Sequence, residues 1–235
     1  MKTYRSRSGP SSDRPYYSES DFERICTDAL RETGLYPSEP QPVRIERFIA
    51  KRFGVTPVYE ELPESVMGFT LFGSRGVEAV FISAPLAEEG TKVSERRVNT
   101  TLAHEAGHGL LHTHLFALPQ SLSLFEQDPD VTPTKILCRN EEKPTASPRR
   151  GYDGKWWEHQ ANKAIGPLLL PKELVKQCLQ PFIVSRGLLG LGVLDSTRRG
   201  EAIRLVSETF DVNPVVARIR LEALYPEAAE GQLTL

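Results

Sequence analysis

Residues 101–108 of the chain spell TLAHEAGH and contain the pattern HExxH, formed by His104, Glu105 and His108. Side chains four positions apart lie on the same face of an α-helix, so both imidazoles can be directed at one metal ion. Zn²⁺ accepts imidazole nitrogens readily. Glu105 lies one step round the helix, where its carboxylate can take a proton from metal-bound water, whose pKa the ion lowers to about 7. We therefore expect one Zn²⁺ per chain, with Glu105 as the catalytic base.

The surroundings of the motif favour a buried helix over about residues 94–115. Small or apolar residues recur there at helical intervals: Val98, Leu102, Ala106 and Leu110. The chain has only five histidines, so roughly 0.01 chance matches to HExxH are expected at this composition. The alternative is a surface helix on which two histidines lie near a glutamate without binding a metal.

The third metal ligand is the open question, because catalytic zinc sites use three protein ligands plus water. His114 has the spacing of the pattern HExxHxxGxxH, but Leu111 replaces the glycine that turns the chain there, so we expect His114 to rotate away. His112 stays on the metal face but lies about 6 Å further along the helix. We expect both histidines to support or pack against the site, with His112 the better candidate. Glu158, near the start of a later helix, is the other candidate ligand, and the small Ala161 that follows it would allow that helix to approach the HExxH helix closely.

Composition limits the class of protein. A chain of 235 residues, 39% of them hydrophobic, suffices for one large domain or for one domain with a small helical appendage. A formal net charge of −2 argues against a protein held to nucleic acid by bulk electrostatics. Three widely spaced cysteines, Cys26, Cys138 and Cys178, suit a reducing cytosol. The N-terminus has no apolar stretch, and no run approaches the roughly 18 apolar residues of a membrane span. We therefore expect a cytoplasmic protein.

The chain divides into three predicted parts. Residues 1–18 are rich in Ser, Arg, Tyr and Pro without periodicity, which predicts a disordered tail. Residues 19–190 are expected to form the main domain, and residues 191–235 a C-terminal pair of helices. Within the main domain, residues 116–155 contain several prolines and are predicted to be an irregular insertion, in which residues 134–139 form a candidate strand.

Smaller elements follow from periodicity and capping residues. A capping box at Ser20–Glu23 predicts the start of the first helix. Strand-like runs over residues 66–72 and 77–83, separated by a glycine-containing turn, predict a hairpin. The remaining pattern predicts helices over residues 42–53, over residues 156–166 up to a break at Pro167, over residues 171–179, and two more that join at residues 210–214.

Two segments, AHEAGHGLLH at residues 103–112 and EHQANKAIGPLLLP at residues 158–171, resemble the ImmA/IrrE family of bacterial metallopeptidases. That family pairs an AHExGHxxLH helix with an ExxANxFAxxLLMP segment. The resemblance covers roughly residues 43–225 in outline, but only these two short motifs are specific. Gly166 stands where the family usually has Ala.

The resemblance implies an α+β, zincin-like fold in which a small antiparallel sheet packs on the HExxH helix and C-terminal helices follow. It implies that His104, His108 and Glu158 bind zinc in a gluzincin-like arrangement and that Glu105 is the general base. It also implies site-specific cleavage of a helix-turn-helix transcriptional repressor, so a protein substrate is the expected partner.

Other roles near the metal are expected from residue chemistry. A peptidase needs a donor for the oxyanion of the tetrahedral intermediate, and His112, Arg150 and Tyr152 are the candidates. Cys138, between the two ligand segments, could bind the open zinc position and hold the enzyme latent. The alternative for Cys138 is a small buried hydrophobe.

Two other functions stay open at this point. A zinc-stabilised antirepressor, or another partner-binding protein, would disable its target without hydrolysis, although it would not require Glu105. Alternatively, the C-terminal helices could bind DNA through Arg218 and Arg220. Acidic neighbours argue against that reading, so direct nucleic-acid binding is not expected: Glu201, Glu208, Asp211 and Glu222. The sequence does not indicate the oligomeric state, the scissile bond or the activating signal.

Overall fold

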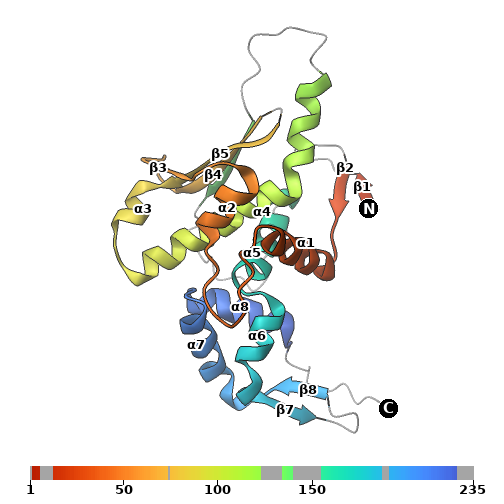
Figure 1. Cartoon of the computed structure of the whole chain (residues 1–235), viewed down its shortest axis with the longest axis vertical. Helices are drawn as coiled ribbons and strands as arrows, with labels where there is room; N and C mark the ends of the chain where they lie inside the picture. The colour runs from red at the N-terminus through yellow and green to blue at the C-terminus, as the bar shows by residue number, and fades with distance from the viewer. Residues whose placement is uncertain are drawn as a thin grey trace.

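The computed structural model describes residues 2–5, 13–73, 75–122, 134–139, 155–186 and 191–226. Helices predominate and the strands form small sheets, so the chain belongs to the α+β class, as predicted. The long helix α4 (Lys92–Leu122) runs between a β-sheet and the group of C-terminal helices (Figure 1).

Helix α4 carries the HExxH motif and is longer than predicted. It begins two residues before the predicted start at residue 94, and it continues through residues 116–122, which were expected to belong to the irregular insertion. That part of the prediction is wrong because extending an existing helix costs far less than nucleating one, so a proline in the pattern does not have to end it.

The largest sheet has four strands in the order β3-β5-β4-β6. The predicted hairpin is confirmed as β4 (Val66–Gly73) and β5 (Gly76–Ser83), and the candidate strand of the insertion is confirmed as β6 (Thr134–Arg139), antiparallel to β4. Edge strand β3 (Val58–Glu60) pairs with β5 in parallel, so the sheet is mixed rather than purely antiparallel. β3 runs parallel to β5 because the chain reverses its direction twice between them, once before β4 and once after it.

The N-terminal segment differs most from its prediction. Strands β1 (Lys2–Arg5) and β2 (Asp13–Tyr16) form an antiparallel pair, so the expectation of a disordered tail is wrong for these residues. Helix α1 (Glu19–Glu32) follows directly, and its capping box uses Ser18 and Asp21 rather than Ser20–Glu23. Both side chains satisfy amide groups at the helix start that have no partner within the helix.

Helices α2 (Ile45–Phe53), α3 (Ala84–Glu88) and α5 (Trp156–Leu169) pack against α4, and α6 (Lys172–Cys178) continues from α5 toward the C-terminal elements. α2 ends at a left-handed Gly54, and α3 follows β5. α5 supplies the second motif, and α6 starts after Pro171. Pro167 lies inside α5 instead of ending it, and the helix closes with the Leu170 amide donating to the Gly166 carbonyl.

The C-terminal elements are a small hairpin and two helices. A 3₁₀ turn, η2 (Gln180–Phe182), leads into β7 (Ile183–Arg186), which pairs with β8 (Leu191–Leu194). The predicted boundary at residue 190 therefore falls between two paired strands. After a second 3₁₀ turn, η3 (Ser196–Arg198), come the two predicted helices, α7 (Arg199–Thr209) and α8 (Pro214–Leu224).

One hydrophobic cluster joins the helices of both halves of the chain. It includes buried side chains from α1, α2, α4, α5 and α8, among them Leu30, Phe48, Leu102, Leu168 and Leu221. The C-terminal helices therefore share their core with the helices that carry the two motifs. Among the described helices, none is both long and apolar enough to cross a membrane.

Candidate metal centre

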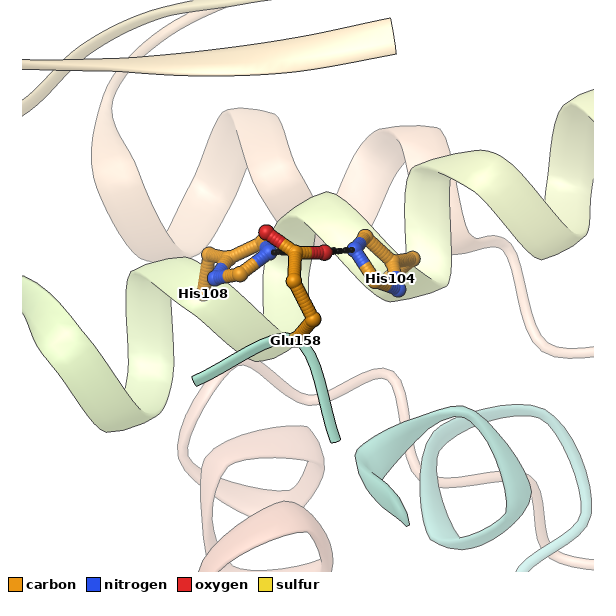
Figure 2. Close-up of side chains that lie close together, drawn as sticks. All are labelled: His104, His108 and Glu158. Carbon is orange, nitrogen blue, oxygen red and sulfur yellow. Dashed lines mark hydrogen bonds and ion pairs between the residues drawn. The ribbon is translucent and has the colours of Figure 1, made fainter. Parts of the chain in front are cut away.

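The two motifs meet where α4 and α5 cross. His104 and His108 project from successive turns of α4, and Glu158, in the first turn of α5, extends between them (Figure 2). Glu158 Oε2 lies 3.1 Å from His104 Nε2 and 3.6 Å from His108 Nε2, and the two Nε2 atoms are 3.0 Å apart. Three potential ligand atoms therefore converge on one point, as the sequence predicted.

Small residues allow the two helices to approach this closely. A Cβ atom added at Gly107 would lie only 3.0 Å from the Ala161 carbonyl oxygen and 3.0 Å from the Ala164 Cβ. The expectation that Ala161 permits a close approach is therefore confirmed. This contact brings the carboxylate of Glu158 within reach of the histidines.

Hydrogen bonds to the other ring nitrogens orient both histidines. His104 Nδ1 is 3.0 Å from Asn162 Oδ1, an acceptor, so Nδ1 carries a hydrogen. His108 Nδ1 is 2.9 Å from His112 Nδ1, and burial lowers the pKa of His108 to about 4, so this imidazole is neutral near pH 7. Burial also lowers the pKa of His112. Each ligand histidine is thus held through Nδ1, with Nε2 directed at Glu158.

The three converging atoms, His104 Nε2, His108 Nε2 and Glu158 Oε2, offer several lone pairs but few hydrogens. Burial raises the pKa of Glu158, but hydrogen bonds to His104 and His108 outweigh this effect and hold its pKa well below the usual range, so the side chain is a carboxylate. Without a metal, His104 would have to carry a second hydrogen, on Nε2, and this one hydrogen would face two acceptors, Glu158 Oε2 and His108 Nε2. A cation placed among the three atoms satisfies all of them at once.

The distances fit Zn²⁺. Metal–ligand bonds of about 2.1 Å in a tetrahedron separate the ligand atoms by about 3.4 Å. The separations here are 3.0, 3.1 and 3.6 Å, and the donors are two imidazole nitrogens and one carboxylate oxygen. This set matches catalytic zinc sites with two histidines and one glutamate. The structure shows that His104, His108 and Glu158 could hold a metal ion, and the choice of zinc rests on this chemistry.

Glu105 lies beside this group with its side chain fully buried. The Thr70 hydroxyl, on β4, donates to Glu105 Oε2 at 2.6 Å, whereas Oε1 has no hydrogen-bond partner among the described residues. Burial raises the pKa of Glu105 to about 7, although the charge of His104 and the Thr70 hydrogen bond oppose the shift. One carboxylate oxygen is therefore held in place, while the lone pairs of the other are unused by the described residues.

Three residues in contact with the site were not singled out from the sequence: Thr70, Gln160 and Asn162. Asn162 belongs to the ExxAN motif, so its position could have been noticed by asking what orients His104. Thr70 carries no such signal, because its contact with Glu105 depends on how β4 packs on α4.

The structure describes only some of the other residues that the sequence analysis singled out. His112 is fully buried against His108, and His114 is exposed, as expected from their helical positions. Arg150 and Tyr152 lie outside the described residues. The backbone of Cys138 pairs with Gly68 in the sheet, but its side chain is not among those described, so the proposed latency stays a prediction.

No protein-family model matches this chain, and no curated protein matches it. The interpretation of the site therefore rests on the geometry above and on the two short motifs.

Proposed function

We propose that this protein is a cytoplasmic, zinc-dependent endopeptidase that cleaves a specific protein partner. The observation that carries the proposal is the convergence of His104, His108 and Glu158 beside the buried carboxylate of Glu105, whose Oε1 has no hydrogen-bond partner in the part of the chain that the structure describes. A site that only stabilised the fold would not need this fourth residue, since burying a carboxylate without full hydrogen bonding is costly.

The proposed chemistry assigns the proton transfers to Glu105. A Zn²⁺ ion held by His104, His108 and Glu158 would supply a Lewis acid that polarises the scissile carbonyl and acidifies the attacking water. Glu105 Oε1 accepts the proton of that water while Thr70 holds Oε2. The same carboxyl group then returns this proton to the leaving amine, and burial, which raises the pKa of Glu105 in the metal-free protein, favours the protonated form that this step needs.

The proposed substrate class comes from the resemblance to the ImmA/IrrE family, whose members cleave helix-turn-helix repressors. The C-terminal helices α7 and α8 are proposed to pack against the peptidase rather than to bind DNA. In support of this, the guanidinium of Arg220 is buried and pairs with Glu23 on α1, so it is not available to phosphate or bases.

The test is to incubate the zinc-loaded protein with the helix-turn-helix repressor encoded beside its gene and to measure fragment masses. We expect one main cleavage, and we expect the Glu105→Gln variant to retain zinc but to lose activity by about 10²- to 10⁴-fold. Inactivation of the repressor to the same extent by wild type and Glu105→Gln, without fragments, would contradict the peptidase and favour a non-cleaving antirepressor.

A further inference from the structure

Behind the metal centre, hydrogen bonds connect His108 to the N-terminal segment. His108 Nδ1 contacts His112 Nδ1 at 2.9 Å, and His112 Nε2 contacts Gln160 Oε1 at 3.0 Å. Gln160 Nε2 in turn donates to the main-chain carbonyl oxygen of Pro15, on β2, at 2.7 Å. His108, His112 and Gln160 are buried, as is Pro15, so water does not compete for these contacts.

The direction of each hydrogen bond can be worked out from the Pro15 carbonyl, at the end of the series that is farthest from the metal centre. A carbonyl oxygen can only accept, so Pro15 fixes the amide nitrogen of Gln160 toward itself and turns Oε1 toward His112. Because Oε1 can only accept, His112 carries its hydrogen on Nε2, and neutral His112 has a lone pair on Nδ1. His108 must then donate from Nδ1, which leaves the lone pair of its Nε2 facing Glu158 and His104.

The other tautomer of His108 would be unable to bind a metal at this place. It would carry a hydrogen on Nε2, in the middle of the proposed ligand set, and would oppose two lone pairs on the Nδ1 atoms of His108 and His112. The N-terminal segment that supplies Pro15 is itself held against α4, since the Tyr17 hydroxyl donates to the Leu111 carbonyl at 3.5 Å.

We propose that Pro15, Gln160 and His112 form a positioning relay that holds His108 in its metal-binding tautomer, so that the N-terminal segment is a working part of the metal centre. This inference rests on the proposed zinc site. Hydrogen-bond partners of metal-ligating histidines typically contribute about 10- to 100-fold to metal affinity.

Nuclear magnetic resonance of the metal-free, full-length protein labelled with ¹⁵N-histidine tests the relay without any metal. Long-range ¹H–¹⁵N correlations distinguish the two nitrogens of each ring. We expect a hydrogen on Nδ1 of His108 and on Nε2 of His112. A hydrogen on Nε2 of His108 in the wild-type protein would overturn the inference.

Zinc dissociation constants, measured by competition with a chelator, test the consequence. We expect His112→Phe and Gln160→Leu to bind zinc about 10- to 100-fold more weakly than wild type. His112→Asn should recover most of the affinity, because its amide oxygen can accept from His108 Nδ1. The matched control is Lys163→Gln. Lys163 lies on α5, as Gln160 does, and its partly exposed side chain pairs with Glu19.

Gln160→Glu isolates the contribution of Pro15. A carboxylate can still accept from His112 Nε2 but cannot donate to the Pro15 carbonyl, so we expect about a tenfold loss of zinc affinity. Wild-type affinity in this variant would remove Pro15 from the relay, and wild-type affinity in His112→Phe would end the inference while leaving the zinc site intact. Absence of zinc binding by the wild-type protein would instead contradict the proposed function.

Discussion

Among the described residues, charged and histidine side chains are buried at the candidate metal centre and in the region where the C-terminal helices join the rest of the chain. We call the second the C-terminal junction and define it by Arg96, Arg220 and their acidic partners. There, Arg220 Nη2 lies 2.9 Å from Glu23 Oε2, and Arg96 Nε lies 2.8 Å from Asp211 Oδ1. Each cation at the junction therefore meets an anion supplied by the chain itself.

The metal centre has the opposite composition. His104 Nε2, His108 Nε2 and Glu158 Oε2 face one another, and the chain supplies at most one hydrogen to this group. Glu105 Oε1 nearby has no hydrogen-bond partner among the described residues. A junction that is complete without a ligand stabilises the fold, whereas acceptors that face one another form a group that could hold a cation.

The largest expected effect is the loss of metal from the His108→Ala variant. Two remaining ligands are too few for a catalytic zinc site, so we expect the zinc content to fall from about one ion per chain to near zero. Elemental analysis after dialysis measures it. His114→Ala, an exposed histidine on the same helix, is the control. Equal zinc content in wild type and His108→Ala would remove the contrast between the two regions.

Breaking the C-terminal junction should reduce stability without affecting zinc. In Arg220→Met, Glu23 loses its bidentate partner and the Leu170 carbonyl loses a donor, so we expect the free energy of unfolding to fall by about 3–5 kcal/mol. Urea denaturation measures this quantity. Arg218→Met, whose exposed side chain pairs with Glu222 on the same helix, should change it by less than about 1 kcal/mol. Loss of zinc from folded Arg220→Met would show that the two regions are not independent.

Replacing Glu105 should stabilise the metal-free protein, in contrast to replacing Arg220. Burial raises the pKa of Glu105 from 4.5 to about 7, so between these values the folded state keeps a proton that the unfolded state has lost. The free energy of unfolding therefore falls from this source as pH rises, by up to about 3 kcal/mol above pH 7.

Denaturation of metal-free Glu105→Gln between pH 4.5 and 8 measures this contribution. We expect the variant to gain stability over wild type as pH rises to about 7 and no further above that. Glu95→Gln, an exposed glutamate on the same helix, provides the control. A stability difference that is constant with pH would contradict a buried Glu105 with a raised pKa.

The smallest expected effect comes from Thr70→Val. Valine keeps the shape of the side chain but removes the hydroxyl that lowers the pKa of Glu105 and holds Oε2. We expect cleavage at neutral pH to slow by about tenfold, which corresponds to about 1.4 kcal/mol, and the acidic limb of the rate profile to move to higher pH. Thr70→Ser keeps the hydroxyl and should retain most of the activity. An unchanged pH profile in Thr70→Val would show that Thr70 does not act through Glu105.

Local patterns predicted much of the fold because the signals are short in range. The hairpin of β4 and β5, strand β6 and the helices α5 to α8 lie close to their predicted positions. The failures occurred where partners distant in the sequence decide the structure. The N-terminal strands have no periodicity of their own, and Pro15 is buried where Gln160, 145 positions later, donates to its carbonyl oxygen.

The same distinction applies to Gly166, in α5. Nothing near it in the sequence explains the small residue. In the structure, a Cβ at this position would lie 3.2 Å from Arg220 Cδ, so the glycine leaves room for the arginine that pairs with Glu23. The glycine at position 166 is therefore explained by a residue that lies more than fifty positions away along the chain.

The sequence by itself determined the pair of histidines on one helical face and the glutamate beside them, because a helix places residues four apart together whatever surrounds it. The sequence also indicated Glu158 as a candidate ligand, but it did not determine that Glu158 lies beside the histidines. Only the tertiary structure did that, through the close crossing of α4 and α5 at Gly107 and Ala161. Packing also decided the partners of the site, since burial sets the pKa of Glu105 and distant side chains set the tautomer of His108.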